Sequence, residues 1–398
     1  MHAEELVPAD DHRALAARLD LLHFEDEAPA MVYWHPRGWV LYKLLEDAAR
    51  AHVLAGGYRE VRTPQLMRRP VWERSGHWDA FHDSMFACGD EAALKPVSCP
   101  GHIHLVKRMA PSHRDLPIRI AELGLVHRDE AKGSLHGLMR LRQFTQDDGH
   151  IFCSEDQIFD EVERFCRELP AFYRSFGFDE VTVALSLRPD NRLGNDALWD
   201  RAERALAEVA ERMGLPLVIQ PGAGAIYGPK LEFVLRDRRG RSWQCGTIQL
   251  DFVMPERFDV RYVDSDGDKR LVVMLHRALF GSLERFLGML LEQHGAALPA
   301  WLAPEQVCVI PVGPAHREHA RGIVERLVAA GLRARLDASD ESLKKRIAIA
   351  HHDGVPFQII VGDREIAGGT LAIRARDAQW WAPIDLAIAD LAKRCRSK

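Results

Sequence analysis

The chain lacks the features that mark several large classes of protein. Its 398 residues contain no uninterrupted apolar run of about 18, the length of a membrane span. Residues 1–13 are polar and acidic, without the apolar core of a signal peptide. Its seven cysteines are an odd number without framework spacing, which indicates a reducing compartment rather than disulfides. We therefore expect a cytoplasmic protein that does not associate with membranes.

The glycine fingerprints of two nucleotide-binding folds are also missing. Neither G-x-x-x-x-G-K-[ST] nor G-x-G-x-x-G occurs, which excludes a P-loop and a Rossmann site. No C-x-x-C or H-E-x-x-H is present either, so spacing alone identifies no metal site.

Three dispersed residues nevertheless offer metal-ligand chemistry. We interpret Cys99 as lying next to a Pro-Gly turn that exposes a thiolate, and His150 and His276 fall in strand-like segments. One cysteine and two histidines with an open fourth position would form a catalytic zinc site. From spacing alone, hydrogen-bonded core histidines are the commoner outcome.

What is present is an ordinary globular composition, 47% hydrophobic and 28% charged, with a net charge of −5. The length allows two or three domains. Periodicity predicts helices and strands in turn, and the segments 117–128 and 141–153 form a hairpin with a long polar tip. The other predicted helices are 37–56, 156–174, 197–213 and 281–294, and the other predicted strands are 58–64, 178–186, 231–236 and 246–253. This pattern predicts an α+β domain with a mainly antiparallel sheet, flanked by helices.

A second domain is expected after an Ala- and Pro-rich boundary near residues 295–305. Buried strands now alternate with helices, which predicts a small α/β domain with a mixed sheet. The expected helices are 315–330, 341–352 and 383–396. The predicted domains are thus 1–300 and 301–398.

Polar residues gather in segments that otherwise look like buried strands. They occur in four places: His127–Glu130, Gln146–His150, Tyr227–Lys230, and His276–Arg277 with the helix that follows. Core strands rarely carry such side chains unless these are paired or functional. Arginines that converge from separate elements suit phosphate oxygens, so we predict a nucleotide site on an antiparallel sheet.

Taken together, these segments resemble the threonyl-tRNA synthetases, a family of class II aminoacyl-tRNA synthetases. YREVRTP resembles motif 1, HRDE motif 2 and GSLERFLGML motif 3 of that class. The segments SGHWD, CPGH, SLHGLMR, FTQDD, YGPKLEF, QCGTIQLDF and WLAPEQV match the threonyl family. The resemblance runs from about Asp11 to Lys398 and implies a class II catalytic domain over 1–300 and an anticodon-binding domain over 301–398.

The resemblance also implies site residues. It assigns catalysis to Arg128, Arg285, His77 and Lys230, with His77 accepting the proton of the tRNA ribose hydroxyl, and amino-acid binding to Gln146, Asp148, Tyr227 and Gln249. It assigns ATP binding to Arg128, Glu130, Arg140, Gln244, Ser282 and Arg285, zinc binding to Cys99, His150 and His276, and anticodon reading to Glu365 and Arg374.

The implied function is ATP-dependent activation of L-threonine and its transfer to tRNA(Thr), with one Zn²⁺ per subunit and Mg²⁺ with ATP. A homodimer built through motif 1 is expected. The alternatives are a paralogue that activates threonine or a β-hydroxy amino acid for a biosynthetic acceptor or as an inhibitor-resistant copy, and a non-catalytic binding module.

Two departures from the family accompany the resemblance. Because the likeness begins so near Met1, we expect the ubiquitin-like and editing domains of most members to be absent. Asp340 stands where the family usually has asparagine, and an acid there would repel a nucleic acid unless it is paired.

Overall fold

The computed structural model describes residues 8–396; the first seven residues of the acidic N-terminal segment and residues 397–398 lie outside this range. Its centre is an eight-stranded sheet with the order β10-β9-β11-β12-β15-β8-β7-β3. The strands are β3 (Arg59–Glu60), β7 (Ile118–His127), β8 (Gln143–Cys153), β9 (Val181–Ser186), β10 (Leu217–Gln220), β11 (Lys230–Arg236), β12 (Ser242–Asp251) and β15 (Val273–Ala278). All pairs are antiparallel except the two at the edges, so the predicted mainly antiparallel sheet is confirmed.

The predicted hairpin is the longest pairing in this sheet. Strands β7 and β8 pair antiparallel from Ile118↔Phe152 to His127↔Gln143, and the polar loop between them contains the 3-10 turn Lys132–Ser134. The loop between His127 and Gln143 therefore lies at one edge of the cavity described in the next subsection.

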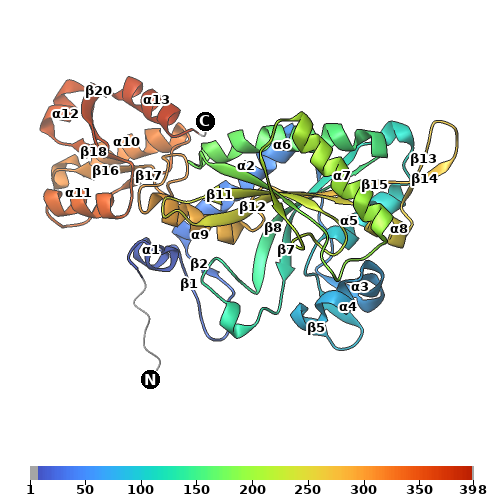
Figure 1. Cartoon of the computed structure of the whole chain (residues 1–398). Coiled ribbons are helices and arrows are strands. Elements are labelled where there is room, and N and C mark those ends of the chain that lie inside the picture. The colour runs from blue at the N-terminus through green and yellow to red at the C-terminus, as the bar shows by residue number, and fades with distance from the viewer. Residues whose placement is uncertain (1–7, 397–398) are drawn as a thin grey trace.

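Two amphipathic helices, α6 (Ile158–Ser175) and α7 (Asp196–Arg212), pack together along one face of the sheet (Figure 1). The buried stripe of α6 includes Val162, Phe165 and Leu169, and the Phe165 ring meets that of Phe233 on β11. Helices α2 (Pro36–Ala55) and α9 (Leu283–His294) extend the same core. The helix predictions from periodicity are confirmed to within two residues at each end.

Three local predictions are wrong. The strand expected over 58–64 is reduced to the two residues of β3. The strand expected over 246–253 ends at Asp251, because the Asp251 carboxylate accepts the backbone N–H groups of Val253 and Met254 and starts helix α8 (Val253–Phe258). The Pro-Gly turn expected after Cys99 is instead the first turn of helix α5 (Cys99–Met109), where proline fits because its missing N–H would have no helical partner.

Several small elements were not predicted. They are the helices α1 (His12–Arg18), α3 (Arg69–Ser75), α4 (His77–Phe81) and α12 (Asp363–Gly368), the strands β1 (Leu22–His23), β2 (Tyr33–Trp34), β4 (Leu66–Arg68), β5 (Ala87–Cys88), β6 (Ala92–Leu94), β10 and β20 (Gln379–Pro383), and the hairpin β13 (Arg261–Val263) with β14 (Lys269–Leu271). Most are too short for a hydrophobic period to develop.

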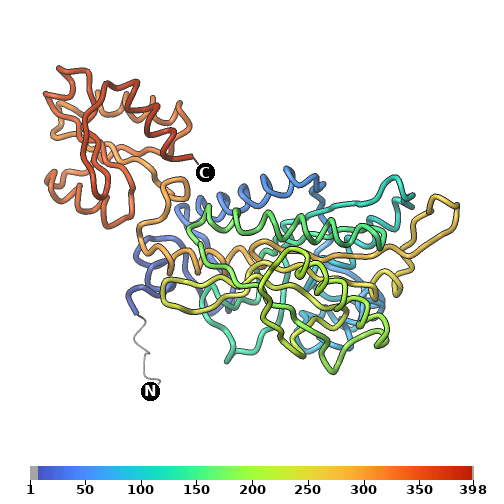
Figure 2. Tube along the Cα trace, turned by 45° about the horizontal axis from the view of Figure 1, so that its top comes forward, coloured from blue at the N-terminus to red at the C-terminus, as the bar shows by residue number. Residues whose placement is uncertain are grey.

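The C-terminal part has its own sheet, in the order β17-β16-β18-β19-β20. These strands are β16 (Val307–Pro311), β17 (Ala334–Leu336), β18 (Phe357–Val361), β19 (Thr370–Arg374) and β20 (Gln379–Pro383). Two pairs are parallel and two antiparallel, so the predicted mixed sheet is confirmed. Helices α10 (Arg317–Ala329), α11 (Leu343–His352) and α13 (Ile384–Arg394) complete a lobe that lies beside the main sheet (Figures 1 and 2). In the described range, residues 8–396, we find no helix that combines the length and the apolar character needed to span a membrane.

Candidate functional site

One row of directly paired residues crosses four strands of the main sheet. His150 on β8 pairs with His276 on β15, His276 pairs with Gln249 on β12, and Gln249 pairs with Lys230 on β11. Directly opposed residues point to the same face with about 5 Å between their Cβ atoms. The register therefore brings four polar side chains, predicted from separate segments, into one line.

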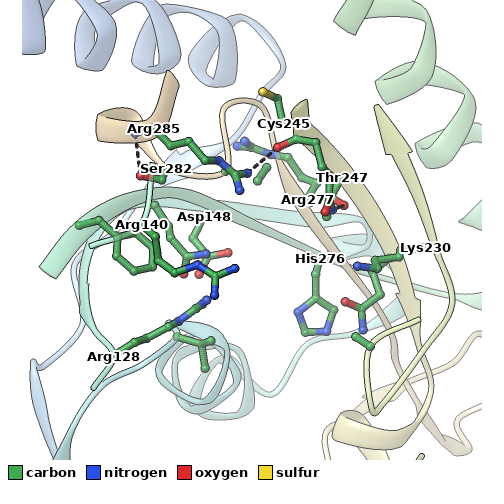
Figure 3. A pocket seen from close by; sticks show the side chains of 18 of the residues that line it. Arg128, Arg140, Asp148, Lys230, Cys245, Thr247, His276, Arg277, Ser282 and Arg285 are labelled. Atoms are coloured by element: carbon green, nitrogen blue, oxygen red, sulfur yellow. Dashed lines mark hydrogen bonds between the residues drawn. The ribbon is translucent and has the colours of Figure 1, made fainter. Parts of the chain in front are cut away.

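A cavity of about 490 Å³ opens over this row. The predicted site residues that line it are Cys99, Arg128, Glu130, Arg140, Gln146, Asp148, Tyr227, Lys230, Gln244, Gln249, His276, Ser282 and Arg285. Figure 3 shows the arginines Arg128 and Arg140 across the cavity from His276 and Lys230. The structure thus brings together most of the residues assigned to the catalytic domain.

The cavity wall carries positive charge on Arg128, Arg140, Arg277, Arg285 and Lys230. The Nε of Arg128 donates to the carbonyl oxygen of Pro96 at 3.1 Å, and its guanidinium lies 5.1 Å from the centre of the Phe144 ring. Arg140 comes from the β7–β8 loop, and Arg285 follows Ser282, whose hydroxyl oxygen accepts the Arg285 N–H at 3.2 Å and caps helix α9. Convergent guanidinium groups suit phosphate oxygens.

Some polar atoms in the cavity wall have no protein partner. Gln146 Oε1, Gln249 Nε2 and Arg285 Nε are buried without a hydrogen bond. Because such atoms are costly to leave unpaired, they indicate that a polar ligand completes the site. Near Gln146, the Asp148 carboxylate accepts the Ser98 N–H at 3.3 Å and adds negative charge to the same end of the cavity.

Cys99, His150 and His276 form a compact cluster at that end, with their ligand atoms all within 4.8 Å of one another. Cys99 Sγ lies 3.4 Å from His276 Nδ1, and His150 Nε2 lies 3.0 Å from the same nitrogen. A tetrahedral zinc centre requires about 3.4 Å between nitrogen ligands and about 3.6 Å between sulfur and nitrogen. The donor set and its spacing therefore fit a zinc ion with one open position.

Hydrogen bonds behind the cluster leave its nitrogens available as ligands. The Asp251 carboxylate lies 2.8 Å from His276 Nε2, so the proton belongs on that nitrogen and His276 Nδ1 keeps its lone pair. Glu122 lies 3.1 Å from His102 Nε2, and His102 Nδ1 lies 2.7 Å from His150 Nδ1. When Glu122 accepts a hydrogen bond from His102 Nε2, His102 Nδ1 accepts one from His150 Nδ1. His150 Nε2 is then unprotonated and faces the cluster.

The electrostatics of the cluster are also consistent with a bound cation. Burial raises the pKa of the Cys99 thiol, and the carboxylates of Asp148 and Asp251 raise it further. Burial lowers the pKa of His150, which keeps its imidazole neutral. A divalent cation would offset the two carboxylates and stabilise the thiolate, and neutral histidine is the form that binds metal. Cys99 is only 4% exposed, so the expectation of an exposed thiolate was wrong.

His77 does not reach the cavity wall. It is buried, its Nδ1 lies 2.8 Å from Ser75 Oγ, and its ring centre lies 5.9 Å from that of Tyr227. Burial lowers the pKa of His77 to about 3, so its imidazole is neutral at physiological pH. Its role as a proton acceptor stays a prediction.

The two residues assigned to anticodon reading lie in the C-terminal lobe. Arg374 is exposed at the end of β19, opposite Gln358 near the start of β18, whereas Glu365 lies in α12 beyond the end of β18. Arg374 and the start of α12 therefore lie at opposite ends of the β18–β19 pair. Asp340 forms an ion pair with Arg317 at 2.7 Å. The positive charge of Arg317 therefore offsets the negative charge that we expected to repel nucleic acid.

Several residues that build the site were not among the predicted site residues. Lys95 and Glu122 form a fully buried ion pair at 2.8 Å, and Asp147 accepts the backbone N–H groups of Phe280 at 3.0 Å and Gly281 at 2.9 Å. Glu122 and Asp251 are polar side chains inside apolar strands, the same signal that singled out the segment Gln146–His150. Applying the same criterion to RIAELG and QLDF would have found both.

Comparisons with known proteins agree with this arrangement. The family described as tRNA synthetase class II core domain (G, H, P, S and T) matches residues 86–294, and the family described as anticodon binding domain matches residues 306–398. The chain is 50% identical over 370 residues to a threonine–tRNA ligase of Halorhodospira halophila and 46% identical over 380 residues to that of Dichelobacter nodosus. These matches cover 92% and 95% of this chain. The chain spans 58% and 59% of the length of these two curated relatives.

Two solved structures share the fold. One is a crystal structure of the RNA binding domain of threonyl-tRNA synthetase from Cryptosporidium parvum Iowa II, with a TM-score of 0.93 and 36% identity over 96% of this chain and 98% of that one. The other is a putative threonyl-tRNA synthetase from Aeropyrum pernix, with a TM-score of 0.82 and 28% identity over 97% of this chain and 98% of that one.

The buried state of His77 predicts a specific pH dependence of stability. Its folded pKa of about 3 lies below the unfolded value of 6.5, so its contribution is complete above pH 6.5 and is lost as the pH falls toward 3. At pH 5 this loss is about 2 kcal/mol. We expect His77→Gln to lose correspondingly less stability than the wild type between pH 7.5 and pH 5 in chemical denaturation.

The control is His82→Gln, since the His82 side chain is 53% exposed and water reaches its charged form in both states. An equal loss of stability in the wild type and His77→Gln would contradict the assignment of a buried, neutral His77.

Proposed function

Because this chain belongs to the class II tRNA synthetases, we propose that it is a threonine–tRNA ligase, which activates L-threonine with ATP and transfers it to tRNA(Thr). The observation that carries the proposal is the position of the Cys99–His150–His276 cluster at one end of a cavity whose wall includes four arginines. One end of the cavity suits an amino acid with a hydroxyl group, and the other suits a nucleotide. The sequence identity of this chain to threonine–tRNA ligases, 46% and 50%, does not favour the alternative of a specialised paralogue.

We assign residues 1–300 to the catalytic domain and residues 301–398 to the anticodon-binding domain. The separate hydrophobic cores of the two sheets support this division. In the second domain, Glu365 and Arg374 are the proposed anticodon readers. Because their backbones are apart along the strand, we assign them to different bases.

At the amino-acid end, Asp148 and the unpaired Gln146 Oε1 are suited to accept hydrogen bonds from the substrate ammonium group. Gln249 Nε2 is an unpaired donor in the same wall, and Tyr227 packs against His276 with their ring centres 5.2 Å apart. Cys99, His150 and His276 would hold the zinc ion, which when bound supplies a Lewis acid for the amino and hydroxyl groups of threonine.

At the nucleotide end, we assign Arg128, which lines the cavity, to clamp the substrate carboxylate and the α-phosphate. Arg140, Arg285, Glu130, Gln244 and Ser282 are assigned to ATP, and Lys230 completes the charged wall. The carboxylate oxygen attacks the α-phosphorus, and pyrophosphate leaves with Mg²⁺. A ribose hydroxyl of the tRNA end then attacks the carbonyl carbon of the adenylate, AMP leaves, and His77 is the proposed acceptor of the hydroxyl proton. Preorganised arginines stabilise the charge that develops on phosphorus, so catalysis rests on positioning and electrostatics.

We also propose that the protein is a homodimer and works in the cytoplasm. The edge strand β3 has one open side, and Tyr33, Trp39 and Leu66 in neighbouring segments are 43%, 45% and 51% exposed. Large exposed apolar side chains and an open strand edge are both suited to an interaction surface. Seven free cysteines suit a reducing compartment.

Removing the proposed clamp tests the activity. We expect the wild type to catalyse threonine-dependent ATP–pyrophosphate exchange and to threonylate a total tRNA pool. Arg128→Ala should lower kcat/KM for exchange by about 100- to 1,000-fold, the usual cost of losing one preorganised donor. The matched control is Arg270→Ala, because Arg270 is 54% exposed on the β13–β14 hairpin. Unchanged exchange in Arg128→Ala would contradict its role.

Metal content tests the cluster independently of activity. We expect the wild type, reconstituted with zinc and desalted, to hold one Zn²⁺ per chain by mass spectrometry, and Cys99→Ala to lose it. Glu122→Gln should weaken zinc affinity about 10- to 100-fold in a chelator competition, because Glu122 orients His102 and through it His150. Cys166→Ala is the control, a buried cysteine outside the cluster. Zinc retained at full stoichiometry by Cys99→Ala would refute the assignment.

A further inference from the structure

His12 links the N-terminal helix α1 to two distant parts of the catalytic domain. It is fully buried, with an exposed fraction of 0%. Its Nδ1 lies 2.8 Å from Glu292 Oε1 near the end of α9, and its backbone N–H donates to the same oxygen at 3.2 Å. On the opposite side of the ring, His12 Nε2 accepts the backbone N–H of Leu138 at 3.1 Å. These contacts together require a neutral imidazole with its proton on Nδ1.

The Leu138 contact lies on the segment that walls the nucleotide end of the cavity. Leu138, Met139 and Arg140 all line the cavity. Gly137, just before them, has φ +48°, and a Cβ atom there would lie 2.2 Å from His12 Nε2. The chain therefore turns directly over the imidazole in a conformation that favours glycine. Helix α9 supports the segment from behind, where a Cβ atom on Gly288 would lie 3.2 Å from Leu138 Cβ.

Asp11, His12 and Glu292 also have the composition of a metal site, but their ligand atoms are already engaged. Asp11 accepts hydrogen bonds from Arg13 at 2.9 Å, and Glu292 forms an ion pair with Arg241. Both ring nitrogens of His12 have the partners described above. Burial lowers the pKa of His12 to about 4, which agrees with a neutral ring that accepts rather than donates at Nε2.

We propose that His12 is a positioning residue for nucleotide binding, which holds the segment 137–141 in place through the Leu138 N–H so that Met139 and Arg140 stand at the ATP end of the cavity. The inference rests on the proposed function, because it assigns that end of the cavity to ATP. His12 does not touch the reacting groups. It acts through the backbone of the β7–β8 loop, which also packs against helix α9 through Leu138.

Three substitutions at one position test the link. His12→Ala removes both ring contacts. His12→Asn keeps a polar atom near the position of Nδ1 but cannot reach Leu138, whereas His12→Gln restores an acceptor near the position of Nε2. We expect KM for ATP in pyrophosphate exchange to rise about tenfold in His12→Ala and His12→Asn, the effect of one lost hydrogen bond. It should return to within about twofold of the wild type in His12→Gln, and KM for threonine should stay unchanged in all three.

Hydrogen exchange provides a readout that does not depend on activity. The Leu138 amide should exchange faster in His12→Ala and His12→Asn than in the wild type and His12→Gln. Leu15→Ala is the matched control, because Leu15 is 2% exposed on the same helix and its side chain forms no hydrogen bond to the loop. This variant should lower Tm without changing KM for ATP.

The outcomes separate the two proposals. If the wild type shows no threonine-dependent exchange, the proposed function fails, and protection of the Leu138 amide alone then decides whether His12 holds the loop. If the wild type is active but KM for ATP and Leu138 exchange are the same in all His12 variants, the inference is overturned. It is also overturned if Leu15→Ala raises KM for ATP as much as His12→Ala does, since the effect then belongs to the helix as a whole.

Discussion

The site depends on the hydrogen-bond register of four antiparallel strands. His150 pairs with His276, His276 with Gln249, and Gln249 with Lys230. These pairs determine which side chains share the face below the cavity. A slip of one residue in any pair would turn one strand's side chains to the opposite face and separate the two histidines. Long antiparallel pairings on both sides of β15 therefore do more than build the core: they define the distance between the proposed metal ligands.

The elements around the sheet complete what the register begins. Helix α5 brings Cys99 to the two histidines and His102 to His150, so one helix supplies both a proposed ligand and its support. Asp251 ends β12, starts α8 and accepts from His276, which joins a strand boundary to the orientation of a ligand. At the nucleotide end, α1 and α9 support the β7–β8 loop from behind through His12. Rigid elements thus hold both ends of the cavity.

Periodicity predicted the long helices and the β7–β8 hairpin, because each has enough residues for one apolar face to be visible. It could not predict the contact between His150 and His276, since these residues are 126 apart in the chain and pair only in the folded sheet. The family resemblance supplied them. The turn expected after Cys99 was wrong because Pro100 lies in the first turn of α5, and a Pro-Gly pair alone does not distinguish a turn from the start of a helix. Glu122 could have been predicted from the sequence, because it is a carboxylate in an otherwise apolar strand.

In the proposed function, the Cys99–His150–His276 cluster and the nearby carboxylates select a substrate that has a hydroxyl group next to its amino group. The direct test is the relative kcat/KM of the zinc-loaded protein for threonine, serine and valine in ATP–pyrophosphate exchange. Serine lacks one methyl group, so it should be activated about 10- to 200-fold less well than threonine. Valine has nearly the shape of threonine but no hydroxyl, so its activation should be lower by about 10,000-fold or more. Valine activated as well as serine would contradict the account, because a pocket that reads only shape would produce that result.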